Sequence, residues 1–190
     1  MGWQLMATRL STEDVASAGG PRAADGRANH HRLVVLAASA AEVVGQAGGW
    51  LFDRARAGWD VNVRVESCGD LRALAILGAD TLDDSVETIL CNPPRGGALA
   101  VSATLLRDDP SLRAQVSDVA KSCSVELLAW GEDWPVELGR RVEVVPHQLS
   151  VAARAFKARA LGAAGLEPGV GPTEILFELT ADVLRPLSPV

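Results

Sequence analysis

The stretch that decides the fold is LVVLAA at residues 33–38, followed by a helical segment at 41–56 and DVNVRV at 60–65. The first run is continuously apolar, which is typical of a strand buried on both faces of a parallel sheet. Residues 41–56 repeat apolar side chains at helical spacing, and Gly58 is the kind of residue that ends a helix. Residues 60–65 alternate as a second strand. This β-α-β order predicts two parallel strands joined by a right-handed crossover.

The alternation of strands and helices continues along the chain. Asp109 and Pro110 begin a helix well, because Asp is a good N-cap and Pro suits the first helical position. The expected later elements are helices at 70–77, 81–90, 109–122 and 149–164, and strands at 98–105, 125–129 and 142–145. This order predicts one Rossmann-like α/β domain of three layers, with a mostly parallel sheet of about five strands.

The chain divides into three expected segments. Residues 1–30 have no convincing period and contain Gly19-Gly20-Pro21, so we expect a flexible leader there. The α/β domain is expected to span residues 31–166. Residues 167–190 are expected to form a C-terminal tail, in which 174–179 is either an edge strand or a partner-binding segment.

Composition excludes several classes of protein. The 190 residues are 48% hydrophobic and 22% charged, which is enough apolar material for one globular domain. No apolar run approaches the roughly 20 residues of a membrane span. A net charge of −6 argues against a general nucleic-acid binder. Three widely spaced cysteines and the lack of a secretory N-terminus favour a cytoplasmic location.

Polar side chains follow the predicted strands where ligands bind in such folds, beyond the carboxyl ends of the sheet. The first turn lacks G-x-G-x-x-G and G-x-x-x-x-G-K, so no nucleotide cofactor is predicted. No catalytic residue and no metal ligand is assigned. The candidate ligand-binding residues are Ser39, Glu42, Ser67, Asp70, Glu132 and His147.

Each candidate also has a structural interpretation. Ser39 and Glu42 have the spacing of a capping box, in which the two side chains close the start of a helix. His147 is equally suited to capping or packing. Glu132 lies between Trp130 and Trp134, where it either helps hold a cation or a sugar or belongs to a solvated turn with both indoles covering the core.

Two features of the helices call for a packing or binding explanation. Gly48-Gly49 inside a helix is costly, so a close approach of that helix to the sheet is expected. Arg154, Lys157 and Arg159 suggest a basic strip on the last helix, which is either an anion contact or a solvated face.

Residues 33–38, AGGWL at 47–51 and AGWDVNV at 57–63 resemble the opening of the LmbE-like (PIG-L) deacetylase family. Residues 71–79 are similar to the next helix of that family, and KARAL at 157–161 resembles a later K-x-x-A-L segment. The resemblance implies a Rossmann-like fold and, in the family, a zinc site with a general base in a P-H-P-D-D-E motif.

The zinc motif is where the chain departs from the family. The family's histidine and two aspartates fall on Ser39, Ala41 and Glu42, and its glutamate falls on Val43. The H-x-D-H motif is absent, and a late family histidine falls on Ala164. A hydrolytic zinc site needs about three good ligands and a base. The resemblance therefore implies a relative in which zinc-dependent deacetylation is lost.

The sequence therefore leaves two function hypotheses. The first is a non-catalytic α/β domain that acts through protein association, as a homo-oligomer or with a partner, without an enzyme activity. The alternative is a small-molecule-binding protein, or a hydrolase or transferase, that uses the cleft at the carboxyl ends of the strands.

Overall fold

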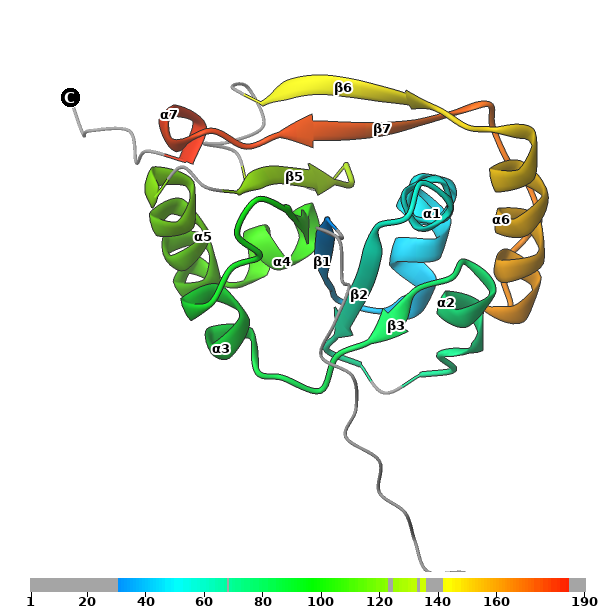
Figure 1. Ribbon diagram of the computed structural model, residues 1–190, viewed down its shortest axis with the longest axis horizontal. Helices are drawn as coiled ribbons and strands as arrows, with labels where there is room; N and C mark the ends of the chain where they lie inside the picture. Colours follow the sequence, from blue (N-terminus) through cyan, green and yellow to red (C-terminus); the bar gives the residue numbers. More distant parts are fainter. Residues whose placement is uncertain (1–30, 68, 123–124, 133, 136–141, 185–190) are drawn as a thin grey trace, which may run out of the picture.

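The computed structural model describes residues 31–67, 69–122, 125–132, 134–135 and 142–184 (Figure 1). The leader expected at 1–30 and the last part of the expected tail lie outside these residues. The strands are β1 (Arg32–Ala37), β2 (Asp60–Val65), β3 (Asp80–Thr81), β4 (Ala98–Ser102), β5 (Glu126–Trp130), β6 (Glu143–Gln148) and β7 (Thr173–Glu178). The helices are α1 (Ala40–Arg56), α2 (Arg72–Ile76), α3 (Val86–Cys91), α4 (Ala103–Asp108), α5 (Pro110–Ser122), α6 (Val151–Ala163) and α7 (Ala181–Leu184).

The strands form one mixed sheet in the order β3-β2-β1-β4-β5-β7-β6. The pairs from β3 to β5 are all parallel, whereas β7 is antiparallel to both of its neighbours. The chain leaves β1 toward β2 and β3, and later returns to the other side of β1 with β4. The strand order therefore reverses between β1 and β4. In open α/β sheets, this point of reversal is where ligands bind.

Helices cover both faces of the sheet, so the predicted three-layer α/β fold is confirmed. On one face α1 and α2 bury side chains such as Trp50 and Leu74 against the sheet, and α6 packs on α1 and α2 with side chains such as Leu161 buried. On the other face α3, α4, α5 and α7 bury side chains such as Leu106 and Val116 (Figure 1). No helix in the described part of the chain is long and apolar enough to span a membrane.

Several elements differ from their expected bounds. The strand predicted at 98–105 ends at Ser102, whose side chain accepts a hydrogen bond from the Thr104 N–H and begins α4. Ala103, Leu105 and Leu106 are buried like the strand, and a short buried helix cannot be told from a buried strand by its apolar pattern. The helix predicted at 81–90 is split into β3 and α3, and Ser85 caps α3.

The sheet has seven strands, and the expected edge strand of the tail is not at an edge. Residues 173–178 form β7, which lies between β5 and β6 and buries Leu176 in the core. The strand at this edge of the sheet is β6, and β3 lies at the other edge. The Leu149 N–H donates to the Pro172 carbonyl, in continuation of the β6–β7 register. Because backbone N–H groups alternate in direction along a strand, the nitrogens of residues 143, 145 and 147 also face β7, and the nitrogen of Pro146 faces the free edge. A proline at that position removes a donor from the exposed edge.

The Gly48-Gly49 pair has a packing role, but the expected neighbour, the sheet, is wrong for both glycines. A Cβ atom on Gly49 would lie 2.5 Å from Leu149 Cδ2, in the segment between β6 and α6. One on Gly48 would lie 3.2 Å from Leu77 Cδ1. Close approach of α1 to the chain around α2 and α6 therefore requires these glycines.

Candidate functional site

The start of α1 forms the centre of the candidate site. Ser39 has an extended backbone, and its Oγ accepts a hydrogen bond of 3.1 Å from the Glu42 N–H. The Glu42 carboxylate accepts one of 3.0 Å from the Ala38 N–H through Oε2. The predicted capping interaction of Ser39 and Glu42 is confirmed, with Ala38 in place of Ser39 as the donor to the carboxylate.

Glu42 also connects the ends of the two strands at which the sheet order reverses. Its Oε1 accepts a hydrogen bond from the hydroxyl of Ser102, the last residue of β4, and Ala38 directly follows β1. Ser102 is fully buried and Glu42 is half-buried. Sequence reasoning missed Ser102, because nothing local to residues 98–105 indicates which side chain lies beside it.

The geometry defines what Glu42 can do chemically. Ala38 and Ser102 each supply one donor, and they fix the orientation of the carboxylate. A carboxylate has about four lone-pair sites, so two remain for a hydroxyl or amine of a ligand. Ser102 is not available as a nucleophile in this arrangement, because its side chain is fully buried and its hydroxyl proton is directed to Glu42.

Ser67 and Asp70 follow the carboxyl end of β2, and both are exposed. The Ser67 N–H donates to the Ala38 carbonyl at 3.1 Å, which brings its backbone next to the end of β1. Asp70 is occupied by Arg72: the side-chain and backbone hydrogen bonds from Arg72 hold the pKa of Asp70 at about 2. Asp70 is therefore a neighbour of the site whose charge is already neutralised by Arg72.

Glu132 follows β5 and is exposed. The two tryptophans beside it belong to the interior: Trp130 is fully buried, and Trp134 contacts Phe177 edge-on with ring centroids 4.8 Å apart. The expectation that these indoles cover the core is confirmed. Neither indole N–H has a hydrogen-bond partner among the described residues.

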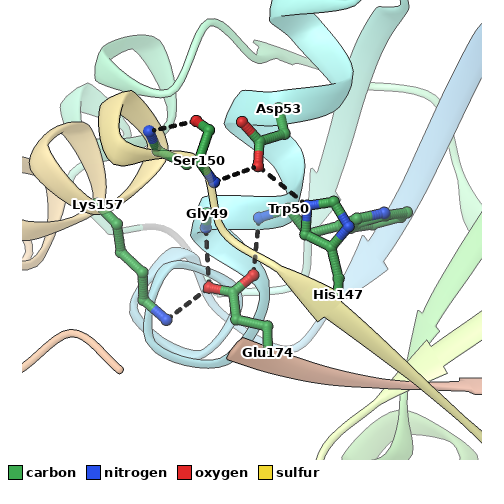
Figure 2. A network of polar contacts seen from close by, with 8 residues as sticks. Gly49, Trp50, Asp53, His147, Ser150, Lys157 and Glu174 are labelled. Carbon is green, nitrogen blue, oxygen red and sulfur yellow. Dashed lines mark hydrogen bonds and ion pairs between the residues drawn. The ribbon is translucent and has the colours of Figure 1, made fainter. Parts of the chain in front are cut away.

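His147 lies apart from the other candidates. It belongs to β6, and its Nε2 is 3.0 Å from Asp53 Oδ2 in the last part of α1 (Figure 2). Because a helix rises about 1.5 Å per residue, Asp53 is roughly 16 Å along α1 from Glu42. The structure therefore divides the six predicted residues between the strand-end site and a second polar cluster, and their roles in ligand binding stay a prediction.

The second cluster connects α1 with β6 and α6. Partial burial raises the pKa of Asp53, but hydrogen bonds from Ser150 and His147 outweigh it and lower that pKa below the usual 3.8. The Ser150 N–H donates to Asp53 at 3.2 Å, and the Ser150 hydroxyl caps α6 by accepting from Ala153 N–H. This arrangement orients His147 and attaches the start of α6 to α1.

A buried ion pair lies next to this cluster. Lys157 Nζ is 2.6 Å from Glu174 Oε1, and both side chains are almost completely buried. The Glu174 carboxylate also accepts hydrogen bonds from the backbone N–H groups of Gly49 (2.9 Å) and Trp50 (2.7 Å), as Figure 2 shows. Both interpretations of a basic surface strip are wrong for Lys157, which faces inward, whereas Arg154 and Arg159 are exposed.

A sequence signal for the buried lysine existed. Lys157 lies at helical spacing between Ala153, Ala160 and Leu161, which form the buried face of α6. A lysine in the centre of an apolar stripe requires a buried partner. The sequence alone does not identify Glu174 as that partner.

The donor set does not form a metal site in the part of the chain that the structure describes. No group of three or more His, Cys, Asp or Glu side chains is placed there to hold an ion. At the positions that correspond to the family's zinc motif, Glu42 is the only carboxylate, and both of its oxygens already accept hydrogen bonds from the protein.

The sequence matches no protein-family model and no curated protein. The fold is similar to that of a deacetylase triple mutant (Orf2*T) of the teicoplanin biosynthetic pathway, with a TM-score of 0.57, 14% identity, and coverage of 77% of this chain and 97% of that one. It is also similar to the zinc-inhibited form of teicoplanin deacetylase Orf2 (TM-score 0.56, 12% identity, 77% and 97% covered). A third similar structure is the A40926 pseudoaglycone deacetylase Dbv21 (TM-score 0.52, 13% identity, 79% and 97% covered). These deacetylases have the LmbE-like fold. The structural similarity therefore supports the predicted resemblance at the level of the fold, and it does not extend to the activity.

Proposed function

We propose that this protein binds a small polar molecule in the crevice at the carboxyl ends of β1 and β4, with Glu42 as the hydrogen-bond acceptor. The observation that carries the proposal is the position of the Glu42 carboxylate. It is half-buried, oriented by Ala38 and Ser102, and located where the strand order reverses. Ligands of open α/β sheets bind at this point.

The charges around the crevice favour a ligand that donates hydrogen bonds. Glu66 follows β2 and Glu132 follows β5, and neither forms an ion pair with a described residue. Hydroxyl-rich or amine-bearing molecules suit such a rim better than anions. The named ligands of the fold neighbours, teicoplanin and the A40926 pseudoaglycone, guide the first choice of probes.

The zinc chemistry that the resemblance implies does not fit these residues. A hydrolytic zinc needs about three protein ligands, whereas Ser39, Ala41 and Val43 supply no carboxylate, imidazole or thiolate at the corresponding positions. We therefore propose that the chain is a degenerate relative of the deacetylases, and no step of its function is assigned to a metal.

A hydrolase or transferase that uses the same crevice is the second candidate, because the fold neighbours are deacetylases. In that case Glu42 would accept a proton from the attacking water or ligand hydroxyl, as a general base. Binding without turnover is preferred, because the described residues place no second acid–base group beside Glu42.

Protein association, the first hypothesis from the sequence, has one supporting observation. Val144 and Ile175 are 55% and 45% exposed and lie on the same face of the β6–β7 pair. Pairing of β6 with a second edge is disfavoured by Pro146, which offers no N–H to it. A partner would have to contact the face of this strand pair. Association and a cytoplasmic location stay predictions.

Titration of the full chain with teicoplanin, and with a panel of monosaccharides and amino sugars, tests the proposal by ligand-observed NMR. Glu42→Gln should weaken binding of any responding probe by about tenfold, because a charged acceptor is worth roughly 1.5–3 kcal/mol. Glu143→Gln is the matched control, since Glu143 is exposed on β6, which β5 and β7 separate from β4 in the sheet. Equal affinities of Glu42→Gln and the wild-type chain would contradict the assignment. Turnover of a bound probe that disappears in Glu42→Gln would instead establish the second candidate.

A further inference from the structure

A cavity that is open to solvent lies at the far end of α1 from Glu42. It has a volume of about 590 Å³ and is lined by the last part of α1, the end of α2 and the start of α6. Phe52 in its wall is ten positions after Glu42, which places it roughly 15 Å further along the helix. The cavity is therefore separate from the strand-end crevice.

The lining of this cavity is apolar and partly aromatic. Phe52 and Phe156 stack in its wall with ring centroids 4.5 Å apart and an angle of 21° between the planes. Phe156 is 38% exposed, although it is a large hydrophobic side chain, and Ile76 is half-buried on the facing helix. The volume falls within the range of about 300–1,000 Å³ that small-molecule sites occupy.

One charged side chain lines the cavity, and it is a cation. Arg56 ends α1, is exposed, and forms no ion pair with a described residue. The nearest acidic residue on the same helix, Asp53, is already bonded to His147 and Ser150. A ligand with an apolar body and one terminal anionic group would cover the exposed aromatic wall and supply the missing partner of Arg56.

We propose that this cavity binds a small aliphatic carboxylate, with its hydrocarbon against Phe52, Ile76 and Phe156 and its carboxylate at Arg56. The site does not depend on the function proposed for Glu42, because no residue is shared between the two.

Sodium octanoate is the probe, with octan-1-ol as the uncharged molecule of the same chain length, in a ¹H–¹⁵N NMR titration of the full chain. Octanoate should shift the amide signals of residues 52–56, 75–78 and 152–156 and bind more tightly than octanol. Arg56→Gln should weaken octanoate by about fivefold, or ~1 kcal/mol, the upper range for an exposed ion pair. Arg154→Gln, an exposed arginine of α6 that does not line the cavity, should change the affinity by less than about twofold.

Ala75→Trp fills the cavity from an exposed position and should abolish the shifts, with Ala152→Trp as a second filling variant if the first does not fold. The proposal is overturned if octanoate and octanol bind alike, if Arg56→Gln binds as the wild type does, or if the shifts occur elsewhere. It is also overturned if octanoate does not bind and sedimentation shows a dimer that Ala75→Trp dissociates, because the cavity then receives a second copy of the chain.

Discussion

Removing the buried ion pair of Lys157 and Glu174 should destabilise the protein unequally, depending on which partner is changed. Lys157→Met leaves Glu174 buried but still bonded to the N–H groups of Gly49 and Trp50. Breaking a buried pair costs about 3–5 kcal/mol, and we expect about 3 here because those two donors partly compensate the remaining charge.

Glu174→Leu should lower the free energy of unfolding by more than Lys157→Met does, because it leaves an unpaired buried ammonium and two buried amide groups without acceptors. Each unsatisfied amide costs at least about 1 kcal/mol, so we expect about 5 kcal/mol in total. The double variant Lys157→Met/Glu174→Leu removes both charges and leaves only the amides. It should therefore be more stable than Glu174→Leu alone, by about 3 kcal/mol.

Urea unfolding followed by circular dichroism gives the free energy of unfolding of each variant. Lys121→Met is the control, since its ion pair with Asp118 is exposed, and a change within about 0.5 kcal/mol is expected. If Glu174→Leu is no more costly than Lys157→Met, the two amide bonds do not contribute as described. If Glu174→Leu is unfolded without urea, Glu174→Gln, which keeps a carbonyl acceptor, takes its place in the comparison.

Three further outcomes follow from local geometry. Gly49→Ala should destabilise the protein by about 1–2 kcal/mol, because its Cβ would lie 2.5 Å from Leu149 Cδ2. Gly45→Ala, whose Cβ would have its nearest atom at 3.9 Å, should instead stabilise the protein by up to about 1 kcal/mol. Thermal unfolding of both variants tests this difference in sign. Because the pKa of Asp53 is lowered in the folded state, its contribution to stability is present above about pH 4 and is lost as the pH falls. The free energy of unfolding of Asp53→Asn should therefore decrease less steeply than that of the wild type between about pH 6 and about pH 3. Equal slopes would contradict this expectation. Asp109→Ala should destabilise the protein by about 1 kcal/mol in urea unfolding, because Asp109 Oδ1 accepts hydrogen bonds from the N–H groups of residues 111 and 112 at the start of α5. An unchanged free energy of unfolding would show that this cap is dispensable.

The sequence predicts those features whose causes are local. The strand at 33–38 and α1 follow from an apolar run and a helical period, and the bond from Glu42 N–H to Ser39 follows from spacing within one turn. Asp109 and Pro110 begin α5 as predicted. In each case the residues that interact are within a few positions of each other, so the pattern contains the information.

The features that could not be predicted depend on contacts between distant segments. Ser102 reaches Glu42 across 60 positions, and Glu174 reaches Gly49 across 125. The place of β7 in the sheet is likewise set by two antiparallel pairings, and the alternation of residues 173–178 is the same for an edge or an interior strand. Chain order alone predicts His147 at the strand-end cleft, whereas its imidazole contacts Asp53 in the last part of α1, 94 positions earlier.

The interior position of β7 affects the order in which a growing chain can fold on the ribosome. β6 has no neighbour in the sheet other than β7, and the end of β7 is synthesised 30 residues after the end of β6. At translation rates of about 5–20 residues per second, β6 waits roughly 2–6 s for its partner. During this interval Lys157 and the amides of Gly49 and Trp50 also lack the carboxylate of Glu174. Emergence of a single strand thus supplies the neighbour of β6 and the acceptor that joins α1 to α6, so the last part of this sheet should form in one late step.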